Sequence, residues 1–166
     1  MIYNLNFLHL ALVLGAALCV RLALREIGGR AMSPSRFARL PLLALAMTFV
    51  FFLFFSSLNR PLWLFGAALL LGLAIGVARG VTMRLRFDHM YQLVRPARHF
   101  VLLWVTLGLA AAVVGEAIGS IVGGAAGAMA RLAAAELAAL CTGALVGRAL
   151  AVAIRLSHAP HVDLRR

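Results

Sequence analysis

Long apolar runs dominate this sequence and constrain its fold more than any other feature. Five of them are close to the roughly 20 residues that a helix needs to cross the hydrocarbon core of a bilayer. Soluble domains are about 25% charged, whereas this chain of 166 residues is 13% charged and 64% apolar. We therefore predict an all-α membrane protein with five transmembrane helices in a compact bundle. The predicted spans are 5–24, 40–58, 62–78, 100–123 and 132–154.

The placement of arginine orients these spans. All 16 basic residues are arginine, and 14 of them lie near or after the C-terminal ends of spans one, three and five. Arg60 and Arg131 are the two in the remaining connections. Cytoplasmic segments carry the excess of positive charge, so we predict a bacterial inner-membrane protein with its N-terminus outside. Residues 1–156 then form one transmembrane domain, and residues 157–166 form a cytoplasmic tail.

The net charge of +11 does not indicate a nucleic-acid partner. Proteins that bind nucleic acid gather their basic residues on one face, whereas these arginines punctuate the apolar runs. Such a pattern predicts membrane lipids as partners, through contacts with lipid phosphates. On the cytoplasmic side the same arginines could also form a joint site for a phosphorylated ligand. The residues concerned are Arg21, Arg79, Arg84, Arg86 and Arg148.

The connection 81–100 is the longest between two spans and has a pattern of its own. Apolar and polar residues alternate from Val81 to Asp88, which is typical of a strand, and an extended pattern resumes before Pro96. We predict a short cytoplasmic β-hairpin between the third and fourth transmembrane helices. An amphipathic helix at the membrane surface is the alternative.

Glycines recur at four-residue spacing in the third, fourth and fifth spans. In lipid, such ladders allow two helix backbones to approach closely. They predict helix packing, either inside the bundle or along the seam of a homodimer. The residues are Gly72, Gly76, Gly115, Gly119, Gly143 and Gly147.

The layout resembles the CcdC-like family of small integral membrane proteins. The resemblance lies in Arg21 at the end of span one, Pro41 at the start of span two, and the glycine-rich "LLLGLAIG" of span three. It continues through "MRLRFDHMYQLVRP" and "TGALVGRAL". The family takes its name from an association with cytochrome c maturation genes, so the resemblance implies a link to that process. It implies no catalytic residue.

Polar residues of several spans fall in the outer leaflet of the predicted topology. They are His9, Glu116, Arg131 and Glu136. A charge inside hydrocarbon costs about 2.5–3.5 kcal/mol on insertion scales unless it meets a partner or water. Glu116 therefore either pairs with Arg131, Arg60 or His9, or faces an outward cavity and binds a proton, cation or amine together with Glu136. Because the histidine and carboxylates come from different spans with no local ligand spacing, we predict no metal site.

No nucleotide-binding loop, metalloprotease motif or serine-hydrolase motif occurs in the chain. We therefore expect no catalytic residue and no cofactor. The first hypothesis is a non-catalytic protein that acts as a homo-oligomer or as an accessory subunit of a larger membrane complex. The alternative is a small proton-coupled transporter or ligand-binding membrane protein that uses Glu116 and Glu136.

Overall fold

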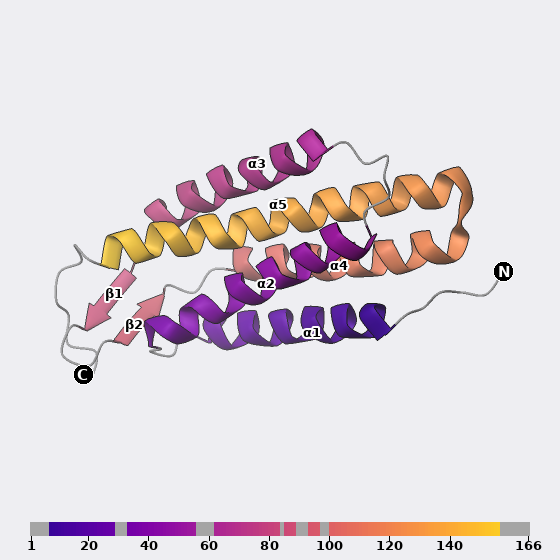
Figure 1. Cartoon of the computed structure of the whole chain (residues 1–166). Coiled ribbons are helices and arrows are strands. Elements are labelled where there is room, and N and C mark those ends of the chain that lie inside the picture. Colours follow the sequence, from indigo (N-terminus) through magenta and orange to yellow (C-terminus); the bar gives the residue numbers. More distant parts are fainter. Residues whose placement is uncertain are drawn as a thin grey trace.

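The computed structural model describes residues 7–28, 33–55, 62–83, 85–88, 93–96 and 100–156. Within these ranges it contains five α-helices and one pair of short strands (Figure 1). The helices are α1 (Phe7–Ile27), α2 (Pro34–Phe55), α3 (Leu62–Thr82), α4 (Val101–Val122) and α5 (Gly124–Leu156). The strands are β1 (Leu85–Asp88) and β2 (Leu93–Pro96). The predicted tail, residues 157–166, lies outside the described residues.

Four of the helices, α1, α3, α4 and α5, are long and apolar enough to cross a membrane. Helix α2 contributes a shorter apolar stretch, Phe37–Leu53. Large apolar side chains are exposed all along the bundle, among them Leu70 and Val114. A soluble domain rarely exposes so much apolar surface, whereas lipid tails would cover it. The helices therefore fit a multi-pass membrane protein.

Consecutive helices run in alternating directions (Figure 1). As a result α1 begins at one end of the bundle and α5 finishes at the other. We call the end with the α4–α5 connection the turn end, and the end with β1 and β2 the strand end. At the strand end the two strands pair antiparallel, with Arg86 opposite Arg95 and Phe87 opposite Val94. Residues 89–92, which join the strands, lie outside the described residues.

Two helices begin earlier than the predicted spans. Helix α2 starts at Pro34 instead of residue 40, because proline suits the first turn of a helix. Pro41 therefore lies inside α2 and does not open it. Helix α5 starts at Gly124 instead of residue 132, since the alanine-rich segment that was expected to be a connection continues the helix. The α4–α5 connection is reduced to Gly123 and Gly124, whose φ angles of 64° and 59° suit glycine.

Helix α5 is the central element of the bundle. It packs against α2, α3 and α4, while α1 packs against α2 and α4 (Figure 1). Helix α3 lies on the opposite side of α5 from α1 and packs mainly on α5. The positions of α2, α3 and α4 therefore depend on the faces that α5 presents to them, whereas α1 packs on α2 and α4.

Glycines make the α3–α5 interface. A Cβ built on Gly76 would lie 2.2 Å from the Ala144 carbonyl oxygen, and one on Gly143 would lie 2.2 Å from that of Leu69. Such distances show that the backbones touch where side chains are missing. Gly72 and Gly147 make the same kind of contact, with the carbonyl oxygens of Leu140 and Leu73. The ladders of α3 and α5 thus lie in an interface within one chain.

A pair of hydroxyl groups joins α2 to α5. The oxygens of Thr48 and Thr142 lie 2.6 Å apart, and Thr142 also donates to the Ala44 carbonyl at 3.3 Å. Both threonines are buried. Hydrogen bonds of this kind link helices inside a membrane because no water competes for the groups.

Replacing Thr142 by valine is expected to lower the free energy of unfolding by about 1 kcal/mol, because valine keeps the shape but loses the interhelical hydrogen bonds. The free energy can be measured by titration with sodium dodecyl sulfate in mixed micelles. Thr106→Val is the matched control, since the Thr106 hydroxyl is also buried but donates to carbonyls of its own helix. An equal loss in both variants would show that the Thr48–Thr142 pair does not hold α2.

Candidate functional site

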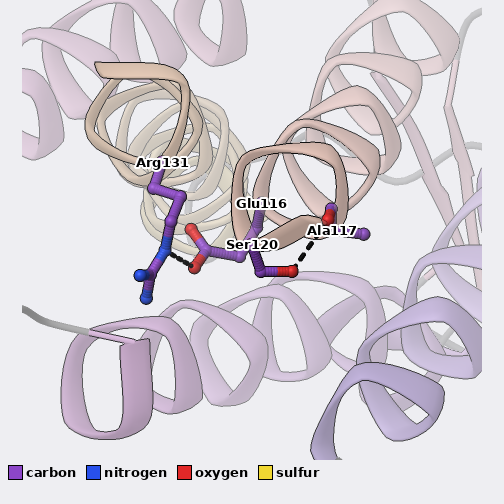
Figure 2. Close-up of polar contacts among 4 residues, drawn as sticks. All are labelled: Glu116, Ala117, Ser120 and Arg131. Carbon is purple, nitrogen blue, oxygen red and sulfur yellow. Dashed lines mark hydrogen bonds and ion pairs between the residues drawn. The ribbon is translucent and has the colours of Figure 1, made fainter. Parts of the chain in front are cut away.

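Glu116 of α4 forms an ion pair with Arg131 of α5 near the turn end (Figure 2). The Glu116 side chain is fully buried, and Arg131 Nε donates to its Oε1 at 2.7 Å. Figure 2 shows the carboxylate pointing from α4 toward α5, while the Ser120 hydroxyl turns back to its own helix. Of the three partners expected for Glu116, the structure shows Arg131 in this ion pair.

Small residues let Arg131 reach across to α4. A Cβ on Gly119 would lie 2.5 Å from Arg131 Cγ, so only glycine leaves room for the arginine stem. Gly127, one turn before Arg131, faces the Gly119 carbonyl oxygen in the same way. Gly115 makes a looser contact, with 3.4 Å between its ideal Cβ and that of Ala134. The glycines of α4 thus set the distance at which the ion pair forms.

A second buried ion pair, which the sequence did not predict, lies at the strand end. Arg148 Nη2 donates to the Glu26 carboxylate of α1, and both side chains are largely buried, 15% and 7% exposed. The Arg148 guanidinium also stacks 4.9 Å above the Phe37 ring of α2, which is a cation–π contact. It lies 3.8 Å from Met83 Sδ, just after α3. Arg148 of α5 therefore contacts α1, α2 and the residue that follows α3.

The two arginines of these pairs are 17 positions apart on α5, from Arg131 to Arg148. At 1.5 Å per residue this corresponds to about 26 Å along the helix axis. The hydrocarbon core of a bilayer is about 30 Å thick. The spacing of the two ion pairs along α5 is therefore close to the thickness of the layer that the helices would cross.

Glu136 does not join the Glu116–Arg131 pair. It follows Arg131 by five residues, which turns it about 140° around the helix and away from α4. Helices α3 and α5 run parallel, and Gly143 of α5 faces Leu69 of α3. Glu136 lies seven residues before Gly143, so it is level with the first turn of α3, where it is half-buried. His9, the other predicted polar residue, is buried on α1.

The arginines predicted on the cytoplasmic side occupy different environments. Arg21 and Arg79 are exposed on α1 and α3, whereas Arg148 is the ion-paired residue described above. Arg84 lies outside the described residues, and Arg86 lies in β1 with its side chain outside the description. The contacts of these last two therefore stay predictions.

Arg155 has a role that the sequence did not reveal. Its Nη1 donates to the carbonyl oxygens of Gly80 and Met83, at 2.8 and 2.6 Å. Carbonyls at the end of a helix have no partner within it, so Arg155 of α5 caps the last turn of α3. From the sequence alone, an arginine near a helix end indicates the orientation of that helix in the membrane. The carbonyl groups that Arg155 binds lie at the end of a different helix, so the sequence did not predict this contact.

Among the described residues, two cavities that open on the surface of the bundle are relevant to function. One, of about 100 Å³, lies at the strand end between α3, α4 and α5 and has Arg79 and Arg148 in its lining. The other, of about 470 Å³, is an apolar groove between α2 and α3 with α5 as its floor. Glu116, Glu136 and His9 line neither of these cavities. The described residues contain no group of three or more histidines, cysteines or acids that could hold a metal ion.

Comparison with protein-family models, with curated proteins and with solved structures gave no match for this chain. The function is therefore inferred from the ion pairs, the glycine contacts and the cavities of the bundle.

Proposed function

We propose that the protein is a non-catalytic, multi-pass protein of the bacterial inner membrane and an accessory subunit of a larger membrane assembly. In this proposal α2 crosses the membrane together with the four longer helices. The turn end faces outward, and β1, β2 and the tail lie in the cytoplasm, as the arginine distribution predicts. The resemblance to the CcdC-like family extends the proposal to an assembly that serves cytochrome c maturation.

The Glu116–Arg131 ion pair is the observation that best supports this proposal. A buried carboxylate bound to a fixed arginine is a means of joining two helices, and breaking such a pair is costly. A transporter needs a carboxylate that is accessible to its ligand, whereas the Glu116 side chain is fully buried and bound to Arg131. The burial and pairing of Glu116 with Arg131 therefore favour a structural role for this ion pair over a role in transport.

The contacts between the glycines of α3 and α5 limit which surfaces of the protein are available to bind another subunit. The ladders of α3 and α5 are occupied by each other within one chain, so they are not free to form a homodimer seam. Outward-facing residues of α3 such as Leu70 and Leu71 stay exposed. We propose the outer face of α3 and the cytoplasmic strands as surfaces for partner subunits or further copies of the chain.

Recovery of the assembly tests this proposal. The tagged protein would be expressed at its natural level, cross-linked in the membrane, solubilised in mild detergent and quantified by mass spectrometry. We expect at least one partner subunit at constant stoichiometry, or a defined oligomer of the chain itself. A tagged multi-pass protein of unrelated function serves as the control for non-specific recovery. A monomer with no stoichiometric partner would contradict the proposal.

A further inference from the structure

The cavity at the strand end combines apolar walls with a cationic rim. Its apolar lining includes Ile75 of α3, Val101 and Val105 of α4, and Leu145 of α5. Arg79 and Thr82 of α3 lie at the same cavity. Because α3 and α4 both pack on α5, a gap stays open between them, and α5 closes it at the back.

Arg79 is the cation available to a ligand in this cavity. Its side chain is exposed, and the described residues offer it no carboxylate. Arg148 lines the same cavity, but its charge is compensated by Glu26. The Thr82 hydroxyl donates back to carbonyls of α3, at 3.1 Å each from Ala78 and Arg79.

The position of Arg79 is supported from α5. Arg155 holds the end of α3 through the carbonyls of Gly80 and Met83. A Cβ on Gly80 would lie 2.6 Å from the Ala151 Cβ, so the last turn of α3 is in close contact with α5. The rim of the cavity is thus fixed before any ligand arrives, which lowers the entropy cost of binding.

Depth and charge both indicate the class of ligand. The cavity lies beside Arg148, which the proposed topology places near the cytoplasmic edge of the hydrocarbon layer. In addition to Arg148, the exposed arginines Arg21, Arg25 and Arg79 lie at this end, whereas Glu26 is the one carboxylate among the side chains described there. Basic pockets between transmembrane helices at such a depth suit anionic lipid headgroups.

We propose that this cavity binds an anionic phospholipid, with its phosphate at Arg79 and the upper part of one acyl chain against the apolar wall. A volume of about 100 Å³ is far smaller than a whole phospholipid. The cavity therefore takes the junction between headgroup and chain, and the rest of the lipid lies along the outside of the bundle. This proposal does not depend on the accessory-subunit role.

Native mass spectrometry in detergent tests the proposal with three probes: phosphatidylglycerol, phosphatidylcholine and inorganic phosphate. We expect phosphatidylglycerol to bind in preference to phosphatidylcholine, and inorganic phosphate at equal concentration not to displace it. Arg79→Gln should weaken phosphatidylglycerol binding about fivefold, the effect of about 1 kcal/mol per basic residue. Ile75→Trp, which fills the cavity without changing a charge, should weaken it as well.

Arg21→Gln is the matched control, because it removes an exposed arginine at the same end that does not line the cavity. It should change the affinity less than twofold, and circular dichroism should show that every variant keeps its helices. Equal affinities of Arg79→Gln and Arg21→Gln would overturn the site. Equal binding of the two lipids would overturn the charge argument. Full displacement by inorganic phosphate would show an anion site in place of a lipid site.

Discussion

Gly76→Ala is expected to separate α3 from α5 and to lower the free energy of unfolding by about 3 kcal/mol. The added methyl group would lie 2.2 Å from the Ala144 carbonyl oxygen and 2.8 Å from the Arg148 backbone nitrogen. Neither backbone atom can move aside as a flexible side chain could, so the helices must part, and overpacking of this kind costs about 1–3 kcal/mol or more. Alanine favours a helix over glycine by up to about 1 kcal/mol, so helix propensity alone would give the opposite sign.

Gly66→Ala is the matched control for this substitution. Gly66 lies on the same helix, and a Cβ there meets nothing within 4 Å. We expect Gly66→Ala to leave the protein equally stable or to stabilise it by up to about 1 kcal/mol. Unfolding in mixed micelles gives the free energies, and amide hydrogen exchange of α3 shows whether that helix detaches. A stable Gly76→Ala variant with protected α3 amides would contradict the backbone contact.

Arg131→Met is expected to cost about 3 kcal/mol of stability. It leaves the Glu116 carboxylate buried without its arginine, and removing one partner of a buried ion pair costs about 3–5 kcal/mol. We expect the lower end of that range because the Arg131 side chain is 32% exposed and partly solvated. Unfolding titration in mixed micelles measures the loss.

Removing both charges should be far less costly than removing one. In the double variant Glu116→Leu and Arg131→Met, no buried charge is left behind, so we expect most of the lost stability to return. Arg21→Met is the control for loss of an exposed arginine and should cost less than about 0.5 kcal/mol. If Arg131→Met cost no more than Arg21→Met, the Glu116–Arg131 pair would not hold α4 to α5.

Much of the helical layout could be predicted from the sequence. The apolar runs located four long helices, because length and hydrophobicity together indicate a crossing. The predicted helix boundaries were less accurate where a segment is rich in glycine. The glycine- and alanine-rich segment before Arg131 read as a connection, yet it forms the first two turns of α5. Glycine is a poor helix former in isolation, but here Gly127 packs on Gly119.

The pairing of polar residues was harder to predict, because it depends on how each helix is rotated. Glu116 was recognised as unusual, but Arg131, Arg60 and His9 were all possible partners. Glu26 was missed because it follows Arg25 at the end of a span, where charges are ordinary. Only the packed structure shows that Arg148, 122 positions away along the chain, reaches it.

A proton-flux assay tests most directly the central claim, which is that the buried Glu116–Arg131 pair is structural and does not carry protons. The protein would be reconstituted into liposomes that enclose a pH-sensitive dye, and the external pH would be stepped. We predict the same flux for the native protein, for Glu116→Gln and for protein-free liposomes. A flux that the native protein supports and Glu116→Gln abolishes would contradict the claim and identify a proton pathway through Glu116.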